Sequence, residues 1–183
     1  MASGAARAEL SDQDVVACVL SGDVECYAVL VERYRKAFGR YATAVCGDAD
    51  LAADAMQEAF IRAYDGLAGC REPERFGAWF FRILTNQCRN HRSRQRAHLP
   101  LETIRAVAPD RADDGVGAAE TRMAIAAALE SLAPEHREAF VLRHVDDRSY
   151  AEMAQLLGER EDTLRMRVHR ARAVVRQRLE GML

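Results

Sequence analysis

The sequence is poor in the residues that build sheets and in those that interrupt helices. Of its 183 residues only 7% are aromatic, 4 are proline and 11 are glycine, and no segment keeps the strict alternation of apolar and polar residues that strands require. No internal repeat or low-complexity tract appears either. We therefore predict an all-α fold, long enough for one or two domains that each bury a core.

Long apolar runs and catalytic motifs are also missing. No run approaches the roughly 20 apolar residues that cross a bilayer, and the opening MASGAARAELSDQD lacks the apolar region of a signal peptide. There is no phosphate-binding glycine-rich loop, no H-E-x-x-H and no convincing Ser/His/Asp arrangement. We expect a cytoplasmic protein that is not an enzyme, with no cofactor, no membrane insertion and no small-molecule substrate.

Cysteine is the third scarce feature. The chain has five cysteines, an odd number, with no C-x-x-C pair and no histidine at zinc-like spacing: Cys18, Cys26, Cys46, Cys70 and Cys88. We expect a reduced protein in which the cysteines are small buried residues and form no metal site. A redox or metal role for Cys70 and Cys88 is the less favoured alternative.

Charge is balanced overall but separated along the chain. The formal net charge is −2, yet residues 76–96 contain five arginines and no acid, and residues 160–183 carry a net charge of +4. Residues 97–159 and 1–75 are acidic, with net charges of −6 and −5. Two basic segments predict two contacts with a polyanion, whereas the acidic parts suit protein partners or solubility.

The C-terminal basic segment has the pattern of a helix-turn-helix. Ser149 and Glu152 form a capping box that begins a short helix, and Gly158 supplies the left-handed residue that ends it. A second helix follows with a continuous apolar face, and from Thr163 to Leu179 it holds six arginines and no acid. Solvated charged faces usually alternate in sign, so this helix is predicted to bind DNA.

Composition divides the chain into parts. Residues 1–10 are expected to be disordered, and residues 11–97 form a first helical domain. Residues 98–120 lose helical periodicity and gain proline, glycine and aspartate, which is typical of a linker. Residues 121–183 form the second domain, and the linker is expected to let the two domains take independent positions on a large partner.

The helix predicted to follow Asp48 has two distinct faces. Its inward side is apolar and includes Phe60. Its outward side combines acids and an amide with an exposed aliphatic residue: Asp54, Gln57, Glu58 and Ile61. Such a mixture suits a protein partner better than nucleic acid, although an ordinary solvated face is an equally good interpretation of this helix alone.

The helix predicted at 76–96 changes character along its length. Its first half is aromatic and apolar, typical of a core, whereas its second half carries arginine and asparagine on every side without nearby acids. Phosphate or base contact explains the second half best. Aromatic residues at the start of a basic helix also suit single-stranded DNA, whose unstacked bases enter apolar pockets.

With these segments in place, residues 11–179 resemble a bacterial extracytoplasmic-function sigma factor, the two-domain form of the sigma-70 family. DADLAADAMQEAFIRAY is similar to region 2.2, which binds the coiled coil of the polymerase beta-prime subunit. The resemblance assigns polymerase binding to this helix at Asp54, Gln57, Glu58, Phe60 and Ile61.

Two further segments resemble the DNA-binding regions of this family. FGAWFFRILTNQCRNHRSRQR is similar to regions 2.3 and 2.4, which melt and read the minus-ten element, and this assigns minus-ten contact to Phe76, Trp79, Arg82, Asn86, Arg89, Asn90 and Arg92. LAPEHREAFVLRHVDDRSYAEMAQLLGEREDTLRMRVHRAR resembles region 4, and this assigns minus-thirty-five contact to Thr163, Arg165, Met166, Arg167, His169 and Arg170.

The resemblance implies the partners of the protein. They are core RNA polymerase, through the beta-prime coiled coil and the beta flap, promoter DNA, and an anti-sigma factor. Two departures stand out: Glu159 replaces a small apolar residue after the glycine of the turn, and Met166 stands where a small polar residue is common. The rival interpretation is a stand-alone helix-turn-helix regulator of duplex DNA, and an enzyme acting on nucleic acid ranks third.

Overall fold

The computed structural model describes residues 9–98 and 124–180, and these residues contain helices and no strand. The all-α prediction is therefore confirmed. The predicted linker at 98–120 and the N-terminal segment 1–10 lie almost entirely outside the described residues. The α-helices are α2 (Asp12–Leu20), α3 (Tyr27–Cys46), α4 (Ala49–Asp65), α5 (Phe76–His98), α7 (Pro134–His144), α8 (Tyr150–Leu157) and α9 (Glu161–Glu180), with a helical segment at 124–130.

Three short 3-10 turns join the first helices: η1 (Val24–Cys26), η2 (Leu67–Gly69) and η3 (Pro73–Arg75). Asp23 is of a residue type that commonly caps helices, but its side chain makes no cap bond and α3 begins only at Tyr27. The reason is the turn at Gly22, whose φ of 107° sends the chain through η1 before α3 can start.

The core of the first unit, residues 9–98, is a layer of aromatic rings on the inner face of α5. Phe76, Phe80 and Phe81 are fully buried. The ring of Phe80 stacks on Phe60 of α4 at 4.5 Å, and the ring of Phe81 meets Tyr41 of α3 at 4.6 Å. Because these rings hold α3, α4 and α5 together, the opposite sides of the helices stay on the surface in a fixed orientation.

The second unit, residues 124–180, contains the predicted helix-turn-helix. The Ser149 side chain accepts from the amide of Glu152, and the Glu152 carboxylate accepts from the amide of Ser149. Gly158 takes the left-handed conformation with φ of 70° and ends α8. The capping box and the glycine stop are thus confirmed as predicted from sequence.

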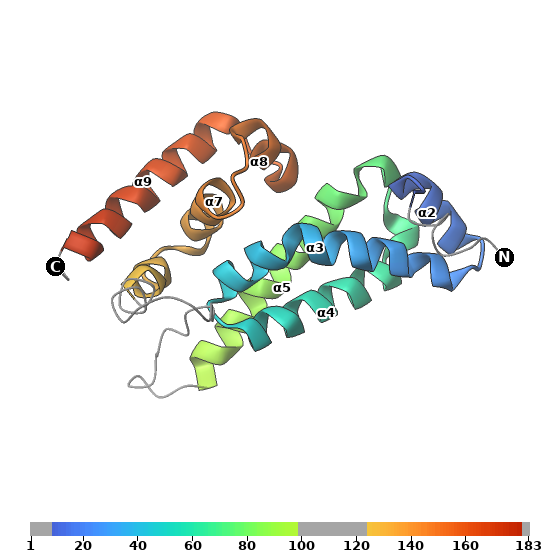
Figure 1. Ribbon diagram of the computed structural model, residues 1–183, viewed down its shortest axis with the longest axis horizontal. Helices are drawn as coiled ribbons and strands as arrows, with labels where there is room; N and C mark the ends of the chain where they lie inside the picture. Colours follow the sequence, from blue (N-terminus) through green and yellow to red (C-terminus); the bar gives the residue numbers. More distant parts are fainter. Residues whose placement is uncertain (1–8, 99–123, 181–183) are drawn as a thin grey trace.

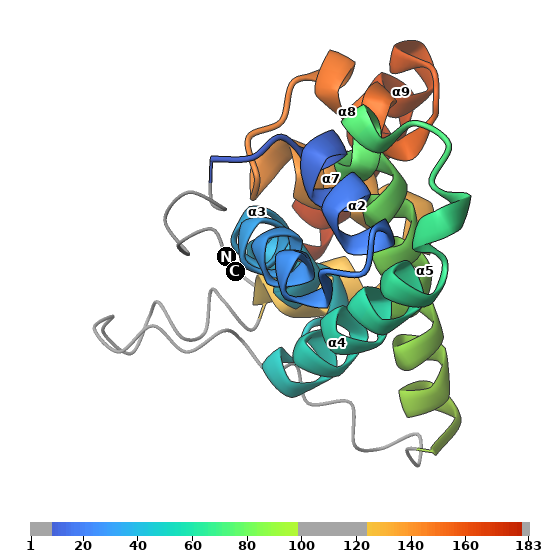
Figure 2. The same ribbon diagram turned by 90° about the vertical axis from the view of Figure 1, so that its right-hand side faces the viewer.

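The two units pack against each other, so they do not take independent positions here. Figure 1 shows α7, α8 and α9 grouped on one side of the long helices, and Figure 2 shows α8 beside the start of α5. Buried residues of α7, α8 and α9 belong to the same apolar cluster as those of α3, α4 and α5. A hydrogen bond adds to this apolar contact between the units: the Arg40 guanidinium of α3 donates to the carbonyl of Val145.

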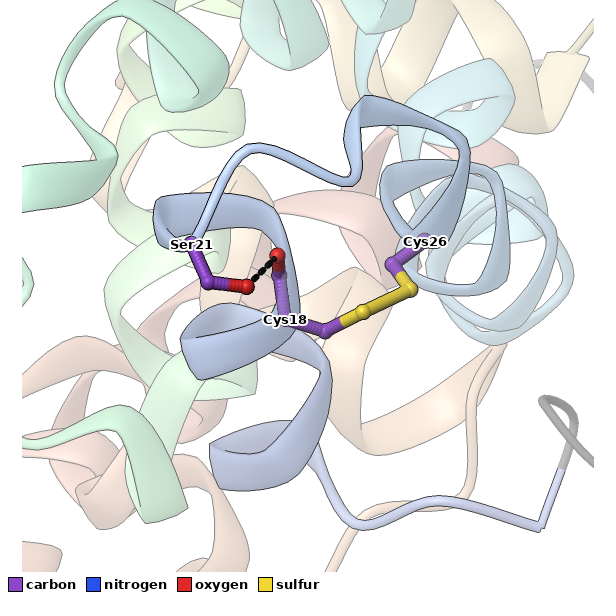
Figure 3. The surroundings of a disulfide bond; sticks show 3 residues. All are labelled: Cys18, Ser21 and Cys26. Carbon is purple, nitrogen blue, oxygen red and sulfur yellow. Dashed lines mark hydrogen bonds between the residues drawn. A yellow bond between two sulfur atoms is a disulfide. The ribbon is translucent and has the colours of Figure 1, made fainter. Parts of the chain in front are cut away.

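The expectation that all cysteines are reduced is wrong. Cys18 at the end of α2 and Cys26 in η1 form a disulfide with a Cα–Cα distance of 6.2 Å (Figure 3). The turn at Gly22 folds η1 back onto α2 and brings the two residues together. The other three cysteines are free and buried, as the sequence predicts: Cys46, Cys70 and Cys88.

None of the helices within residues 9–98 and 124–180 combines the length and the apolar character needed to cross a bilayer.

We expect Ser149→Ala to lower the free energy of unfolding by about 1 kcal/mol, because it removes the acceptor for the amide of Glu152 in the first turn of α8. Urea denaturation measures the change. Ser93→Ala, at an exposed position inside α5, is the matched control and should leave stability nearly unchanged. Equal losses in both variants would show that the cap contributes nothing.

Candidate protein and nucleic-acid interfaces

A shallow apolar groove runs between α3 and α4 on the outer surface of the first unit. Its lining is mostly small and aliphatic, and it comes from α3 at Val31, Arg35, Gly39, Ala42 and Thr43 and from α4 at Ala49, Ala52, Ala53, Met56, Gln57, Phe60 and Ile61. Small residues allow a partner helix to approach closely, while Arg35 and Gln57 offer polar contacts at the rim. The groove therefore has the chemistry of a protein-docking surface.

Of the residues predicted to bind a protein partner, Gln57, Phe60 and Ile61 line this groove, whereas Asp54 and Glu58 lie on α4 outside its lining. Asp54 and Gln57 are exposed, and Ile61 presents a 49% exposed aliphatic side chain. Glu58 is half-buried and pairs with Arg62 at 2.9 Å. Phe60 is only 7% exposed because its ring stacks on α5, so it mainly fixes the position of α4.

A second hollow lies where the loop before α5 meets α8. Trp79 is half-buried at its wall, and Arg71, Arg75 and Arg82 line the same hollow. Phe76, predicted as a minus-ten contact, is fully buried beneath the hollow, with its ring 5.5 Å from that of Trp79. Trp79 rather than Phe76 is therefore the aromatic side chain available to a base.

Sequence reasoning missed Arg71 and Arg75 of this hollow. Both arginines are exposed and lie in a loop whose charges balance, since Arg75 pairs with Glu72 at 3.0 Å. The separation of charge along the chain therefore gave no signal there. Only the fold of the loop against α5 brings them beside Trp79.

Further along α5, some of the side chains predicted to contact nucleic acid are exposed, and others are bonded to acids of the second unit. Arg82, Asn86 and Asn90 are exposed. The Arg89 guanidinium, by contrast, donates two hydrogen bonds of 2.6 Å to the carboxylate of Glu138 on α7. Burial raises the pKa of Glu138 even though Arg89 opposes that shift, which means that this carboxylate is held with little access to water.

Arg92 is the predicted contact that lies furthest from solvent, at 8% exposure. Its guanidinium donates to the carbonyls of Val45 and Cys46 at 2.7 and 2.9 Å, which are free acceptors at the end of α3. It also pairs with Glu130 at 2.6 Å. In this arrangement Arg92 ties α3, α5 and the segment 124–130 together and does not face solvent.

The outward surface of α9 joins with α7 and α8 in a cationic hollow. Four of the predicted contacts line it together, Arg165, Met166, His169 and Arg170, and the rest of its lining is Arg143, His144, Tyr150, Val168 and Arg172. Tyr150 is a residue that the sequence did not single out, and the guanidinium groups of Arg143 and Arg165 lie over its ring. Half-buried Thr163 lies one turn earlier on the same helix.

Electrostatics within this hollow favour an anionic partner. Burial lowers the pKa of His144, and Arg143 and Arg172 lower it further, so positive charge accumulates around a neutral imidazole. Arg165 also bonds Asp162 and Glu161 of its own helix at 3.0 and 2.8 Å, which fixes its orientation. A phosphate group would compete with these two acids for the guanidinium.

Arg167 points away from the other α9 contacts. It pairs with Glu159 at 3.1 Å, and both line a small hollow against Arg82 and Asn86 of α5. Glu159, the unusual residue of the turn, therefore has an ion-pair partner and leaves the α8–α9 turn intact.

Among the described residues, one group has metal-ligand spacing: Cys18, Asp23 and Cys26, whose ligand atoms lie within 4.8 Å of one another. Two of the three donors are sulfurs that are joined in the disulfide, so in this form they are not thiolates that could bind a metal. Cys88 and Cys70 are the pair considered from sequence, but the partner of Cys88 is Cys46. The hydrogen bond between these two thiols raises the pKa of Cys88.

Comparison with known families matches both units of the chain. A family model of sigma-70 region 2 matches residues 30–98, and a model of sigma-70 region 4 matches residues 122–174. The ECF RNA polymerase sigma factor SigM of Mycobacterium tuberculosis is 32% identical over 169 residues, which cover 91% of this chain and 84% of the relative. The ECF RNA polymerase sigma-E factor of Escherichia coli is 28% identical, covering 96% and 97%.

Two solved structures are similar to this one. CnrH in complex with the cytosolic domain of CnrY has a TM-score of 0.67 and 26% identity, covering 93% of this chain and 97% of that one. The sigma factor RpoE in complex with the anti-sigma factor NepR from Bartonella quintana has a TM-score of 0.58 and 23% identity, covering 84% and 93%, and at this identity it supports the fold alone.

We expect Arg92→Ala to lower the free energy of unfolding by about 3 kcal/mol, because it removes the ion pair with Glu130 and leaves the carbonyls of Val45 and Cys46 without this donor. Thermal or urea denaturation measures the loss. Arg94→Ala, at an exposed position two residues along α5, is the control and should change stability by less than about 0.5 kcal/mol. An Arg92→Ala protein of unchanged stability would contradict the structural role.

Proposed function

The chain belongs to the sigma-70 family as an extracytoplasmic-function sigma factor, and we propose how its surfaces divide the work of transcription initiation. As an alternative sigma factor it directs RNA polymerase to specific promoters. The observation that carries the division of roles is the placement of an apolar groove on one side of the region 2 unit and basic side chains on α5 and α9.

We propose that the groove between α3 and α4 binds the beta-prime coiled coil of core polymerase. A helix of the partner would lie over the small residues of the groove, with Ile61 packing against its apolar face. Gln57 and Asp54 would add hydrogen bonds at the rim, and Glu58 would exchange Arg62 for a basic group of the partner. Core binding of this kind usually concentrates in a few central residues.

The hollow at Trp79 is proposed to hold the minus-ten element. A base that leaves the duplex would stack against Trp79 while Arg71, Arg75 and Arg82 contact the adjoining phosphates. Unpairing and unstacking cost a few kcal/mol, and capture of the extruded base offsets that cost. Asn86 and Asn90 would then meet the strand further along α5.

The cationic surface of α9 is proposed to contact the minus-thirty-five element. As the second helix of the helix-turn-helix, α9 would turn Arg165, His169 and Arg170 toward a major groove, and Met166 would make apolar contact. Polymerase would hold both units at once, so the second DNA contact becomes effectively intramolecular. The beta flap is the proposed polymerase contact of this unit.

An anti-sigma factor is the proposed negative regulator, as the membership in the extracytoplasmic-function group implies. It would act by covering the α3–α4 groove or the basic surfaces, and the cytoplasm is the proposed location of all these partners. The stand-alone regulator explains α8 and α9 equally well but leaves the groove on α4 without a role.

The proposed DNA contact of Arg89 has a structural requirement. Its guanidinium is held by Glu138 through two short hydrogen bonds, and Glu138 is nearly inaccessible to solvent. The Arg89 side chain is 45% exposed, but the two N–H groups bonded to Glu138 would become available to a phosphate only after α7 moves away from α5. Since polymerase would hold the two units apart, binding to the core enzyme would release this arginine for DNA.

We expect the two interfaces to be separable by mutation. The double variant Gln57→Ala, Glu58→Ala should weaken binding to sigma-free core polymerase by roughly 30-fold, as loss of a central contact does. Arg165→Ala with Arg170→Ala should leave core binding unchanged and abolish protection of the upstream promoter element. Co-elution with core enzyme and footprinting on promoter DNA are the two measurements.

The matched control for the α4 variant is Glu9→Ala with Gln13→Ala, which removes one carboxylate and one amide from exposed positions near α2, outside the groove. Core binding by this control should equal that of the wild type. If the α4 variant bound core polymerase normally, or if both interface variants lost the same activity, the division of roles would be wrong.

We expect Glu138→Gln to raise the affinity of the free protein for single-stranded DNA by roughly fivefold, which corresponds to losing an ion pair worth about 1 kcal/mol. The amide keeps the shape of the side chain while releasing the charge of Arg89. Fluorescence anisotropy with a labelled oligonucleotide measures the affinity.

Glu135→Gln is the control, because it makes the same charge change at an exposed position one turn earlier on α7. A gain confined to Glu138→Gln supports release of Arg89. An equal gain in both variants would indicate a general charge effect, and an unchanged affinity in Glu138→Gln would refute the requirement.

A further inference from the structure

We propose that Cys18 and Cys26 are a reversible thiol–disulfide site that locks the N-terminal helix α2 onto the rest of the region 2 unit. The structure joins their sulfurs, and their Cα atoms lie 6.2 Å apart, within the range that a disulfide spans without moving the backbone. In a reducing compartment such bonds are usually transient and sense oxidants, so we assign the pair a switching role.

Access separates this pair from the other cysteines. Cys18 is partly exposed, whereas Cys46, Cys70 and Cys88 are all buried. The thiols of Cys46 and Cys88 share a hydrogen bond, but both are buried and neither is open to an oxidant as large as a peptide disulfide. Oxidation therefore begins at Cys18.

The chemistry is a two-step exchange with a low-molecular-weight disulfide such as oxidised glutathione. The Cys18 thiolate attacks one sulfur of the oxidant, forms a mixed disulfide and releases one thiol. The Cys26 thiolate then attacks the Cys18 sulfur and releases the second thiol, so that the protein loses two hydrogen atoms and the oxidant gains them. Cys26 lies at the N-cap of α3, where the helix dipole stabilises the attacking anion.

The link matters because α2 supports the loop that leads into α5. α2 packs against η2 and η3, and its Asp12 accepts hydrogen bonds from Arg33 and Tyr34 of α3. The Tyr34 ring lies 5.3 Å from that of Phe76 at the start of α5. A covalent tie between α2 and η1 therefore steadies the base of the Trp79 hollow.

The test is oxidation of the full-length protein with oxidised glutathione in the presence of a chelator, followed by intact mass and peptide mapping. We expect a mass lower by two hydrogen atoms, a peptide linking Cys18 to Cys26, and reversal by dithiothreitol. Cys18→Ser should abolish the mass loss, and Cys70→Ser, at a buried free cysteine, should retain it. Because Cys18 is partly exposed, its variant is expected to fold.

The mechanical effect has its own readout. Oxidation should raise the melting temperature by about 5 °C, by restricting the unfolded chain. It should slow hydrogen exchange in residues 12–20 and 67–75 while leaving α9 unchanged. Cys18→Ser should show neither effect.

Several results would overturn the proposal. They are an unchanged mass, a link between Cys46 and Cys88, a glutathione adduct that stays on Cys18, or a disulfide between two chains. Hydrogen exchange that is equal in both redox forms would remove the locking role. None of these outcomes depends on polymerase or DNA binding, so the proposal and the proposed function fail separately.

Discussion

The burial of one aromatic layer under α5 is the constraint on which the surfaces of this protein depend. The ring of Phe80 contacts rings on α3 and α4, and Phe76 and Phe81 extend the layer in both directions. Since the rings fix how α5 rotates about its axis, they decide which of its polar side chains face outward. The same layer holds α4 so that the groove it forms with α3 opens to solvent.

Pairing between acids of the second unit and arginines of the first gives the closed arrangement its specificity. Apolar contact alone would bring α7 and α8 against α5 in several registers, but Glu138 and Glu130 each engage one arginine with short hydrogen bonds. These pairs occupy cations that also suit phosphate. The contact between the units therefore engages these two arginines as well as apolar surface.

Local patterns were sufficient for most elements of the fold. The capping box at Ser149 and the glycine stop at Gly158 depend on residues a few positions apart, and the structure has both of them. Periodicity also found the exposed positions Asp54, Gln57 and Ile61 along α4. Such features arise from short-range hydrogen bonding and burial, which the order of residues specifies directly.

What the sequence determined by itself is the set of helices, their apolar faces and the two basic segments, because each follows from neighbours within about one or two helical turns. Only the tertiary structure decided which charged groups are available. Arg89 and Arg92 look equivalent to Arg82 in the sequence, but acids about 40 to 50 positions away hold them. It also joined Cys18 to Cys26 and gathered Arg71 and Arg75 at Trp79. Long-range partners of this kind depend on how helices pack, and helix packing leaves no periodic signal along the chain.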